Sequence, residues 1–290
     1  MGYTVDNAII MAAGLSSRFA PISYEKPKAL VEVRGEVLIE RQICQLKESG
    51  IEDIIVVVGY KKEQFYYLKE KYGVQIVENP EYRVRNNNSS IYAVRQFLKN
   101  SYICSADNYF EVNPFQKEEE ESFYAAVLAD GETEEWCLET DSENYITKVT
   151  VGGQNQWYML GHVFWSQDFS EKFIQILEEV YENEETKKKL WEDIYRDNIE
   201  SLRMKIKRYE RNQIYEFDSL DELREFDSKY RNNSGSMIMQ FIANRMHCKE
   251  EELTEITPYK TDKGTVVGVI FRYKKNRYIY RYGSQKLIKM

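Results

Sequence analysis

Residues 8–30 concentrate side-chain types that are suited to binding an anion. The apolar run Ala8–Met11 has the composition of a buried strand, and the small residues of 12–17 follow it. Small side chains let the backbone approach a ligand, and successive backbone N–H groups at a strand-to-helix turn form a concave anion site. Arg18 and Lys28 add two positive charges. These residues favour a ligand that is rich in phosphate groups.

Two aspartates stand where a metal ion could be held. Asp107 follows the predicted buried strand Tyr102–Ser105, and Asp218 lies between a short predicted strand and a helix start. Asp107 can instead cap a turn, and Asp218 can instead be a helix N-cap, so the sequence alone leaves the roles of both residues open. Mg²⁺ takes one or two carboxylates together with phosphate oxygens and water.

The spacing of residues 14–30 resembles the signature of nucleotidyltransferases that join an NTP to a phosphorylated small molecule. That signature is Gly-x-Gly-Ser/Thr-Arg, a Pro three residues on, then Pro-Lys-x-Leu. Here it reads Gly14-Leu15-Ser16-Ser17-Arg18, Pro21 and Pro27-Lys28-Ala29-Leu30. The loop is neither a Walker loop nor GxGxxG. Its one departure is Ser16 in place of the second Gly, which is a mild change if the backbone there avoids positive φ.

From about Asn7 to about Tyr230 the chain resembles the bacterial CTP:phosphocholine cytidylyltransferases. The motifs that carry this likeness are the opening signature, Gly59-Tyr60, Lys62–Phe65, Tyr67–Val74, Asn86-Asn87 with Ser90 and Tyr92, Ala106–Tyr109, Glu135-Trp136, Asp197–Ile199, Ile214–Glu216 and Asp218-Ser219. The resemblance implies an Mg²⁺-dependent enzyme that converts CTP and phosphocholine to CDP-choline and pyrophosphate. The reaction would be an in-line attack at the α-phosphate.

The resemblance also implies which residues bind the nucleotide. Ala12, Ala13 and Gly14 would contact it through the backbone, and Asn87 and Ser90 would lie at the cytosine. Without the resemblance, the run of asparagines from 86 to 88 is typical of a polar turn ahead of a helix.

The implied catalytic residues are two cations and two carboxylates. Arg18 and Lys28 would bind triphosphate oxygens and stabilise the charge that develops during transfer. Asp107 and Asp218 would hold Mg²⁺.

A choline acceptor adds a chemical requirement. Its trimethylammonium donates no strong hydrogen bond, so proteins hold it against aromatic faces with an acidic residue nearby. A single tryptophan is more often part of the core. The candidate rings are Trp136, Trp191 and Tyr195, and the candidate carboxylates are Glu216 and one of Glu192 or Asp193. The candidates for the acceptor phosphate are Arg83, Arg85 and Lys148.

Three other functions stay open at this point. The acceptor could be 2-aminoethylphosphonate, whose primary ammonium calls for directed acceptors rather than tryptophans. It could be a sugar 1-phosphate, which needs polar residues that read hydroxyls. The chain could also be a non-catalytic nucleotide-binding module, although four charged signature residues together count against this.

Alternating strand and helix patterns predict an α/β fold: a mostly parallel mixed sheet flanked by helices, Rossmann-like. Ligands bind such sheets beyond the carboxyl ends of the strands. The expected strands are 8–11, 54–58, 74–77, 102–105, 123–128, 145–151, 157–165 and 202–207. The expected helices are 36–49, 61–72, 90–99, 168–182, 187–198 and 219–230.

The domain organisation predicted is a nucleotidyltransferase domain at 1–231 and a small α+β segment at 237–290, joined by a linker at 232–236. The last segment, with an expected helix at 237–246 and strands at 266–273 and 277–281, resembles the start of a choline-kinase-like small lobe. This predicts a fragment of a longer protein fused to a choline kinase. The alternative is an accessory subdomain, for instance for contacts in a homodimer.

The bulk properties exclude several classes of protein. The 290 residues are 42% hydrophobic, enough for a sizeable core, and the net charge of −8 argues against a general nucleic-acid binder. The sequence shows no apolar run of membrane-span length and no basic-then-apolar leader. Its four cysteines are scattered, which favours reduced thiols in a cytoplasmic protein over a zinc site or disulfides.

Overall fold

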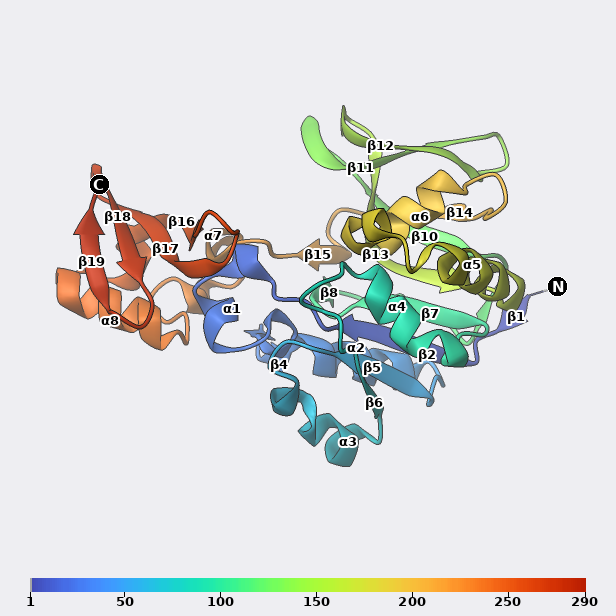
Figure 1. Ribbon diagram of the computed structural model, residues 1–290, viewed down its shortest axis with the longest axis horizontal. Coiled ribbons are helices and arrows are strands. Elements are labelled where there is room, and N and C mark those ends of the chain that lie inside the picture. Colours follow the sequence, from blue (N-terminus) through green and yellow to red (C-terminus); the bar gives the residue numbers. More distant parts are fainter. Residues whose placement is uncertain (1) are drawn as a thin grey trace. The chain divides into compact units, whose positions relative to one another are not determined.

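The computed structural model describes residues 2–290 and divides them into two compact units (Figure 1). Unit 1 contains the chain up to Gly14 together with 38–216, and unit 2 contains 15–37 together with 217–290. The chain therefore leaves unit 1 inside the opening signature, and unit 2 is assembled from two segments that are far apart in sequence.

A nine-stranded mixed sheet forms the frame of unit 1. Its order is β12-β11-β13-β7-β2-β5-β6, and β10 pairs with both β13 and β14. The strands β7, β2, β5 and β6 run parallel, while β13 is antiparallel to β7. The bounds are β2 Asn7–Ala12, β5 Ile54–Val58, β6 Gln75–Glu78, β7 Ser101–Ser105, β10 Phe123–Leu128, β11 Glu132–Thr140, β12 Ile146–Gln154, β13 Trp157–Trp165 and β14 Lys205–Tyr209.

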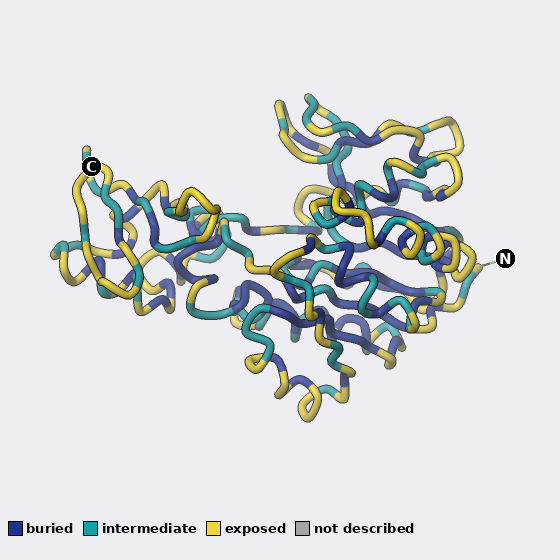
Figure 2. Tube along the Cα trace, viewed as in Figure 1, coloured by how far each residue is buried: buried dark blue, intermediate teal, exposed yellow. Residues whose placement is uncertain are grey.

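The helices of unit 1 lie against this sheet. One core cluster joins the strand residues Ile9, Ile55 and Ile103 to Ile91 of α4 and Phe173 of α5, so these helices cover one face. Figure 2 shows the buried residues concentrated along the strands. The helical bounds are α2 Leu38–Glu48, η3 Lys62–Phe65, α3 Tyr67–Tyr72, α4 Asn88–Val94, η4 Arg95–Phe97, α5 Gln167–Val180, η5 Glu184–Lys188 and α6 Trp191–Asp197.

Two small antiparallel pairs complete unit 1. Strand β1 (Tyr3–Thr4) pairs with β9 (Glu118–Glu119), and β8 (Asn108–Phe110) pairs with β15 (Ile214–Glu216). The second pair aligns Glu216 with Asn108. It therefore places the end of unit 1 beside the turn that follows β7.

Unit 2 combines a short helical segment with a helix-and-sheet segment. Its antiparallel sheet has the order β16-β17-β18-β19, and α8 contributes Met239 and Ile242 to the buried core. The bounds in 15–37 are η1 Ser17–Phe19, α1 Ile22–Glu25, η2 Lys28–Leu30, β3 Glu32–Val33 and β4 Glu36–Val37. Those in 217–290 are α7 Leu220–Phe226, η6 Ser228–Tyr230, α8 Met237–Met246, η7 Glu250–Glu252, β16 Leu253–Lys260, β17 Val266–Tyr273, β18 Asn276–Arg281 and β19 Lys286–Lys289.

Contacts inside unit 2 hold its two segments together. The Glu25 carboxylate accepts the N–H of Ile238 at 3.0 Å, and the rings of Tyr24 and Tyr282 stack with centroids 4.0 Å apart. The Tyr230 hydroxyl donates to the backbone carbonyl of Glu32. The segment that carries Arg18 and Lys28 therefore packs on the C-terminal part of the chain.

The α/β fold class predicted from the sequence is confirmed, and residues 232–236 form an irregular connection between η6 and α8 that is only partly exposed. Ser234 and Ser236 are buried, and the Ser234 N–H donates to the Glu250 carboxylate at 2.9 Å. Polar residues of this type indicated a solvated connection, but here they satisfy backbone groups inside unit 2. The expected division of the chain near residues 231–237 thus falls within unit 2, and the assignment of 1–231 as one functional domain stays a prediction.

Candidate active site

The loops at the carboxyl ends of the parallel strands of unit 1 are bound to one another. The Tyr60 N–H donates to the Ala13 carbonyl at 3.2 Å, and the Ala106 N–H donates to the Met11 carbonyl at 3.2 Å. Ala12 and Ala13 are buried, and open space surrounds the position that a Cβ would take on Gly14. The backbone at Gly14 therefore has open space beside it, and nucleotide binding by Ala12, Ala13 and Gly14 stays a prediction.

Asp107 lies in the turn between β7 and β8, at the same edge of the sheet. The turn is fixed by Gln42 of α2, whose buried amide donates to the carbonyls of Ser105 at 2.9 Å and Asn108 at 2.8 Å. No sequence motif indicated this role, because a glutamine on the apolar face of a helix belongs to no recognisable pattern. Glu216, aligned with Asn108 across the β8–β15 pair, lies next to this turn.

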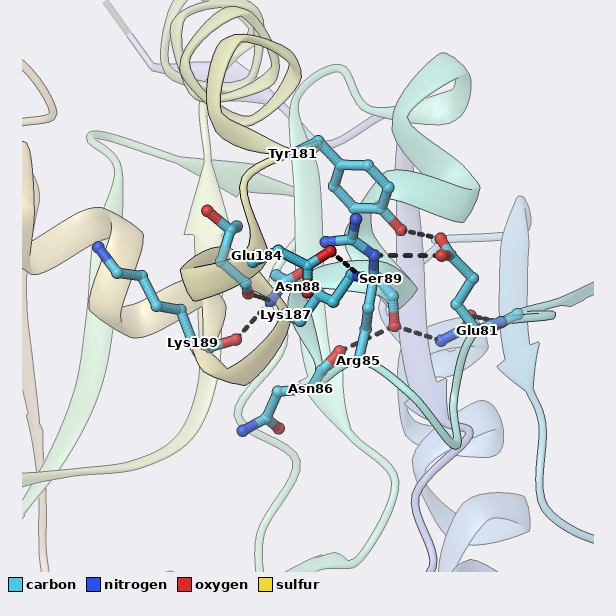
Figure 3. Close-up of polar contacts among 11 residues, drawn as sticks. Glu81, Arg85, Asn86, Asn88, Ser89, Tyr181, Glu184, Lys187 and Lys189 are labelled. Atoms are coloured by element: carbon cyan, nitrogen blue, oxygen red, sulfur yellow. Dashed lines mark hydrogen bonds and ion pairs between the residues drawn. The ribbon is translucent and has the colours of Figure 1, made fainter.

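Three successive asparagines tie the loop before α4 to the segment before α6. Asn86 N–H donates to the Lys187 carbonyl at 2.8 Å, and Asn88 Nδ2 donates to the carbonyl of Thr186 at 2.8 Å and to that of Lys189. Figure 3 shows these side chains and loops from segments about one hundred residues apart. The polar turn that the sequence indicated is thus a connection between two segments.

Asn87, the predicted cytosine contact, has both ends of its side-chain amide bonded. Its Oδ1 accepts the N–H of Trp191 at 2.7 Å, and its Nδ2 donates to Glu192 Oε2 at 3.0 Å. Ser90, the other predicted cytosine contact, is buried and accepts from Asn79 Nδ2 at 3.1 Å. Both residues lie at the start of α4.

The structure separates the two carboxylates between which the sequence could not choose. Asp193 accepts the N–H of Leu190 at 2.8 Å and pairs with Arg196 at 2.8 Å, so it caps and stabilises α6. Glu192 turns instead toward Asn87 and the Tyr124 hydroxyl, which donates to it at 3.3 Å. Burial raises the pKa of Glu192 to about 7, although these two hydrogen bonds oppose the shift.

The candidate aromatic residues for choline divide into two groups. Trp191 is 1% exposed and Tyr195 is fully buried, because both pack in the core with Trp165. Trp136 is only partly buried on β11, and the Arg196 guanidinium lies 5.2 Å from its ring centroid. The rings of Trp191 and Tyr195 are thus closed off from a ligand in this structure, whereas the Trp136 ring already holds a cation.

The candidates for the acceptor phosphate all have other partners. Arg85 is buried, its Nε contacts Glu81 at 3.1 Å, and its guanidinium stacks on the Tyr181 ring at 3.9 Å (Figure 3). Arg83 donates to the Tyr82 hydroxyl, and Lys148 pairs with Glu139 at 2.7 Å. Arg85 therefore acts in this structure as an anchor for the loop that carries Asn87.

Unit 2 brings together three of the predicted catalytic residues. Arg18 contacts Asp218 at 2.7 Å, and the buried ammonium of Lys28 lies 3.7 Å from the other carboxylate oxygen. The Arg18 side chain is 71% exposed, so its guanidinium is accessible to a charged ligand. Ser219, and not Asp218, is the N-cap of α7, and its hydroxyl accepts the N–H of Glu222. Two cations and one carboxylate therefore form a charged cluster within unit 2.

The loop that carries Arg18 corrects one expectation. Ser16 has φ 45° and ψ 46°, in the left-handed region that favours glycine. The substitution of Ser for the second Gly of the signature is therefore not conformationally mild. It places an L-residue where the loop turns into η1.

The donor chemistry of the two predicted metal ligands fits Mg²⁺. Among residues 2–290, no group of three or more His, Cys, Asp or Glu side chains is placed to hold a metal ion. Mg²⁺ does not require such a group, because one or two carboxylates with phosphate oxygens and water suffice. One carboxylate oxygen of Asp218 contacts Arg18 and the other faces Lys28. Such an arrangement is suited to a site where several charges balance one another.

Comparisons with known proteins complete this description. Residues 8–110 match the MobA-like NTP transferase domain. Choline-phosphate cytidylyltransferase from Streptococcus pneumoniae is 40% identical over 227 residues, which cover 78% of this chain and 99% of that protein. The chain belongs to the choline-phosphate cytidylyltransferase family.

Other members and neighbours agree with this family and fold. A 2-aminoethylphosphonate cytidylyltransferase from Lancefieldella rimae is 38% identical and covers 77% of the chain and 93% of its own length. A solved structure of the S. pneumoniae CTP:phosphocholine cytidylyltransferase superposes with a TM-score of 0.75, covering 78% of this chain and 99% of that one. An inositol-1-phosphate CTP transferase from T. maritima, at 18% identity and a TM-score of 0.60, shares the fold.

The family match leaves about a fifth of the chain without a counterpart in these relatives. The C-terminal segment 237–290 forms the helix α8 and the four-stranded antiparallel sheet of unit 2. Its likeness to a kinase small lobe stays a prediction. In residues 2–290, no helix combines the length and the apolar character needed to span a bilayer.

Proposed function

We propose that this chain transfers the cytidylyl group of CTP to phosphocholine, giving CDP-choline and pyrophosphate. The observation that carries the proposal is the 40% identity to a choline-phosphate cytidylyltransferase along 99% of that relative. The partly exposed Trp136 ring, which holds a guanidinium at 5.2 Å, supports a cationic acceptor.

In the proposed reaction a phosphate oxygen of phosphocholine attacks the α-phosphorus of CTP. The new O–P bond forms as the bond from the α-phosphorus to the bridging oxygen breaks, and pyrophosphate leaves with that electron pair. Arg18 and Lys28 would bind triphosphate oxygens and stabilise the charge on the leaving group. The backbone of Ala12 to Gly14 would hold the phosphates, and Asn87 and Ser90 would lie at the base.

The acceptor site and the metal ligands are part of the same proposal. Trp136 and Glu216 would hold the trimethylammonium, one through its ring face and one through its charge. Asp107 and Asp218 would hold Mg²⁺, which when bound supplies charge neutralisation of the phosphates. Trp191 and Tyr195 would support this site from the core.

A second candidate acceptor is 2-aminoethylphosphonate, because a cytidylyltransferase for that compound is 38% identical. Its primary ammonium needs directed hydrogen-bond acceptors, so carboxylates would matter more than the Trp136 ring. The two acceptors therefore predict different effects of the same substitution.

The test is pyrophosphate release from CTP, UTP and GTP, each with phosphocholine, 2-aminoethylphosphonate or glucose 1-phosphate, with and without Mg²⁺. Turnover confined to CTP, phosphocholine and Mg²⁺ is the expected result. Preference for the phosphonate would replace the acceptor but keep the reaction, and no release with any pair would overturn the proposal. If Asp107→Asn released pyrophosphate at the unchanged rate, the metal assignment would be wrong.

The remaining parts of the proposal concern the whole chain. We expect the protein to act in the cytoplasm, where CTP is available. A homodimer and a fusion to a choline kinase in a longer chain stay predictions, which the mass of the native protein in solution would test.

A further inference from the structure

The amide of Asn87 can adopt only one of its two orientations. Its Oδ1 faces a donor, the Trp191 N–H at 2.7 Å, and its Nδ2 faces an acceptor, Glu192 Oε2 at 3.0 Å. A flipped amide would direct NH₂ at an N–H and the carbonyl at a carboxylate. Each end of the amide keeps one further hydrogen-bonding position, an N–H on Nδ2 and a lone pair on Oδ1.

Glu192 is itself held in place by other side chains. The Tyr124 hydroxyl donates to its second oxygen at 3.3 Å, and the Tyr124 ring stacks on Trp191 with centroids 5.7 Å apart. Within residues 2–290, no lysine or arginine forms an ion pair with Glu192. Burial raises the pKa of both Glu192 and Tyr124, and the nearby charges of Asp193, for Glu192, and of Glu192 and Glu216, for Tyr124, act in the same direction.

The side chain of Glu192 therefore bonds to the loop of Asn87 and to Tyr124, in addition to its own backbone N–H at the start of α6. Asp193, the next residue, caps α6 through the Leu190 N–H and pairs with Arg196. Two adjacent carboxylates on one helix thus have separate partners, and this makes Asp193 a matched control for Glu192.

We propose that Glu192 is a positioning residue that fixes the Asn87 amide and thereby sets the preference of this chain for cytosine over uracil. The inference rests on the proposed function, in which Asn87 lies at the base. Cytosine presents an amino donor and a ring-nitrogen acceptor, where uracil presents a carbonyl acceptor and an N–H donor. An amide of fixed orientation matches one pattern and leaves polar groups unpaired against the other.

The test compares Kd for CTP and for UTP, with Mg²⁺, by calorimetry, and kcat/KM for the same nucleotides with phosphocholine. Glu192→Leu removes the acceptor for Asn87, and Glu192→Asp withdraws the carboxylate by one methylene but keeps its charge. We expect each to lower the CTP-to-UTP preference at least tenfold. Glu192→Gln, whose Oε1 can still accept from Asn87, should stay within threefold of the wild type.

The controls separate positioning from a general loss of structure. Asp193→Asn should leave the nucleotide preference unchanged. If Glu192→Leu does not fold, Glu192→Asp provides the decisive comparison. An unchanged CTP-to-UTP ratio in these variants, or no preference for CTP in the wild type, would overturn the inference.

The binding measurement keeps the two proposals distinguishable. A wild type that prefers CTP in binding, loses this preference in Glu192→Asp and transfers to no acceptor would support the inference and overturn the proposed reaction. If the wild type transfers the cytidylyl group to phosphocholine and Glu192→Asp still prefers CTP over UTP, the proposed reaction is supported and the inference about Glu192 is overturned.

Discussion

Ser16 shows how one residue can depart from a family signature at a measurable cost. A non-glycine residue in the left-handed region, as Ser16 is, costs about 1–2 kcal/mol of conformational strain. A glycine would remove this strain, but it loses more backbone entropy on folding, so the net gain is smaller. We expect Ser16→Gly to raise the free energy of unfolding by about 0.5–1 kcal/mol. Ser17→Gly, one residue on in the 3-10 helix η1, should lower it by a similar amount. Urea unfolding measures the free energy of unfolding of both variants. A change of the same sign and size in the two would contradict the argument.

Glu192 gives a prediction for the pH dependence of stability. Its pKa rises from the ordinary value near 4.5 to about 7 in the fold because the charged form is desolvated. A raised carboxyl pKa means that the folded state binds the proton more tightly. The contribution of Glu192 is therefore fully present below about pH 4.5 and is lost as the pH rises through 7.

Glu192→Gln removes this titration. Relative to the wild type, we expect this variant to gain about 1–3 kcal/mol of stability between pH 5 and pH 8. Urea unfolding of both proteins at the two pH values measures the difference. A difference between the two proteins that does not change with pH would show that Glu192 is not desolvated in the fold.

Substitution of Trp136 distinguishes the two candidate acceptors, phosphocholine and 2-aminoethylphosphonate. If its ring holds trimethylammonium, Trp136→Ala should raise the KM for phosphocholine at least tenfold, because one cation–π contact contributes about 0.5–2 kcal/mol and the ring also shields the acceptor from water. Trp136→Phe should recover part of the loss. Steady-state kinetics with phosphocholine and with 2-aminoethylphosphonate decide the matter, since equal losses for both acceptors would exclude a choline-specific ring.

Among the elements, the connection between the loop of Asn86–Asn88 and the segment before α6 is the most open to test. Asn88 is fully buried and donates to two carbonyls of that segment, so Asn88→Ala should cost about 1–3 kcal/mol. Because Asn87 and Ser90 flank it, the KM for CTP should rise severalfold. Asn86→Ala, at an exposed residue that donates to the Lys188 carbonyl at 3.1 Å, is the control and should cost less than about 1 kcal/mol. Thermal unfolding and titration with CTP measure both variants, and an Asn86→Ala variant that loses as much stability as Asn88→Ala would contradict the prediction.

The elements predicted best from the sequence are those whose own pattern of apolar residues shows that they are buried. The apolar run of β5 and the long strand β13 have the predicted bounds, as do α8 and β17 in unit 2. Strand β11 was missed, because its sequence Glu132–Thr140 is mostly polar and it is a strand only through pairing with β12. The helix expected from residue 187 begins at Trp191, since the residues before it form a 3-10 turn that accepts hydrogen bonds from the asparagine loop.

The candidate site was predictable in its motifs but not in its partners. The resemblance of the motifs to the family implied roles for Arg18, Lys28 and Asp218, and the structure brings these three side chains together. The bond of Asn87 to Glu192 joins residues 105 apart in sequence, and no local pattern encodes it. The core positions of Trp191 and Tyr195 likewise depend on the packing of α6 against α5 and the sheet.

The division of the whole molecule leads to a prediction about its C-terminal part. The segment 15–37, which carries Arg18 and Lys28, belongs to the same compact unit as 217–290. It contacts that part through Glu25 with Ile238 and through the Tyr24–Tyr282 stack. A chain that ends at Asn233 loses both contacts. We therefore expect it to unfold at a lower temperature and to bind CTP about tenfold more weakly, a loss of about 1.4 kcal/mol.

The control for this truncation is a chain that ends at Gln285, which removes only the edge strand β19 and keeps both contacts with 15–37. We expect it to bind CTP within twofold of the full chain. Calorimetric titration with CTP and thermal unfolding of the three proteins would measure the effect. If the chain ending at Asn233 matched the full chain in both, the C-terminal part would be an independent appendage, and the segment that carries Arg18 and Lys28 would be held in place without it.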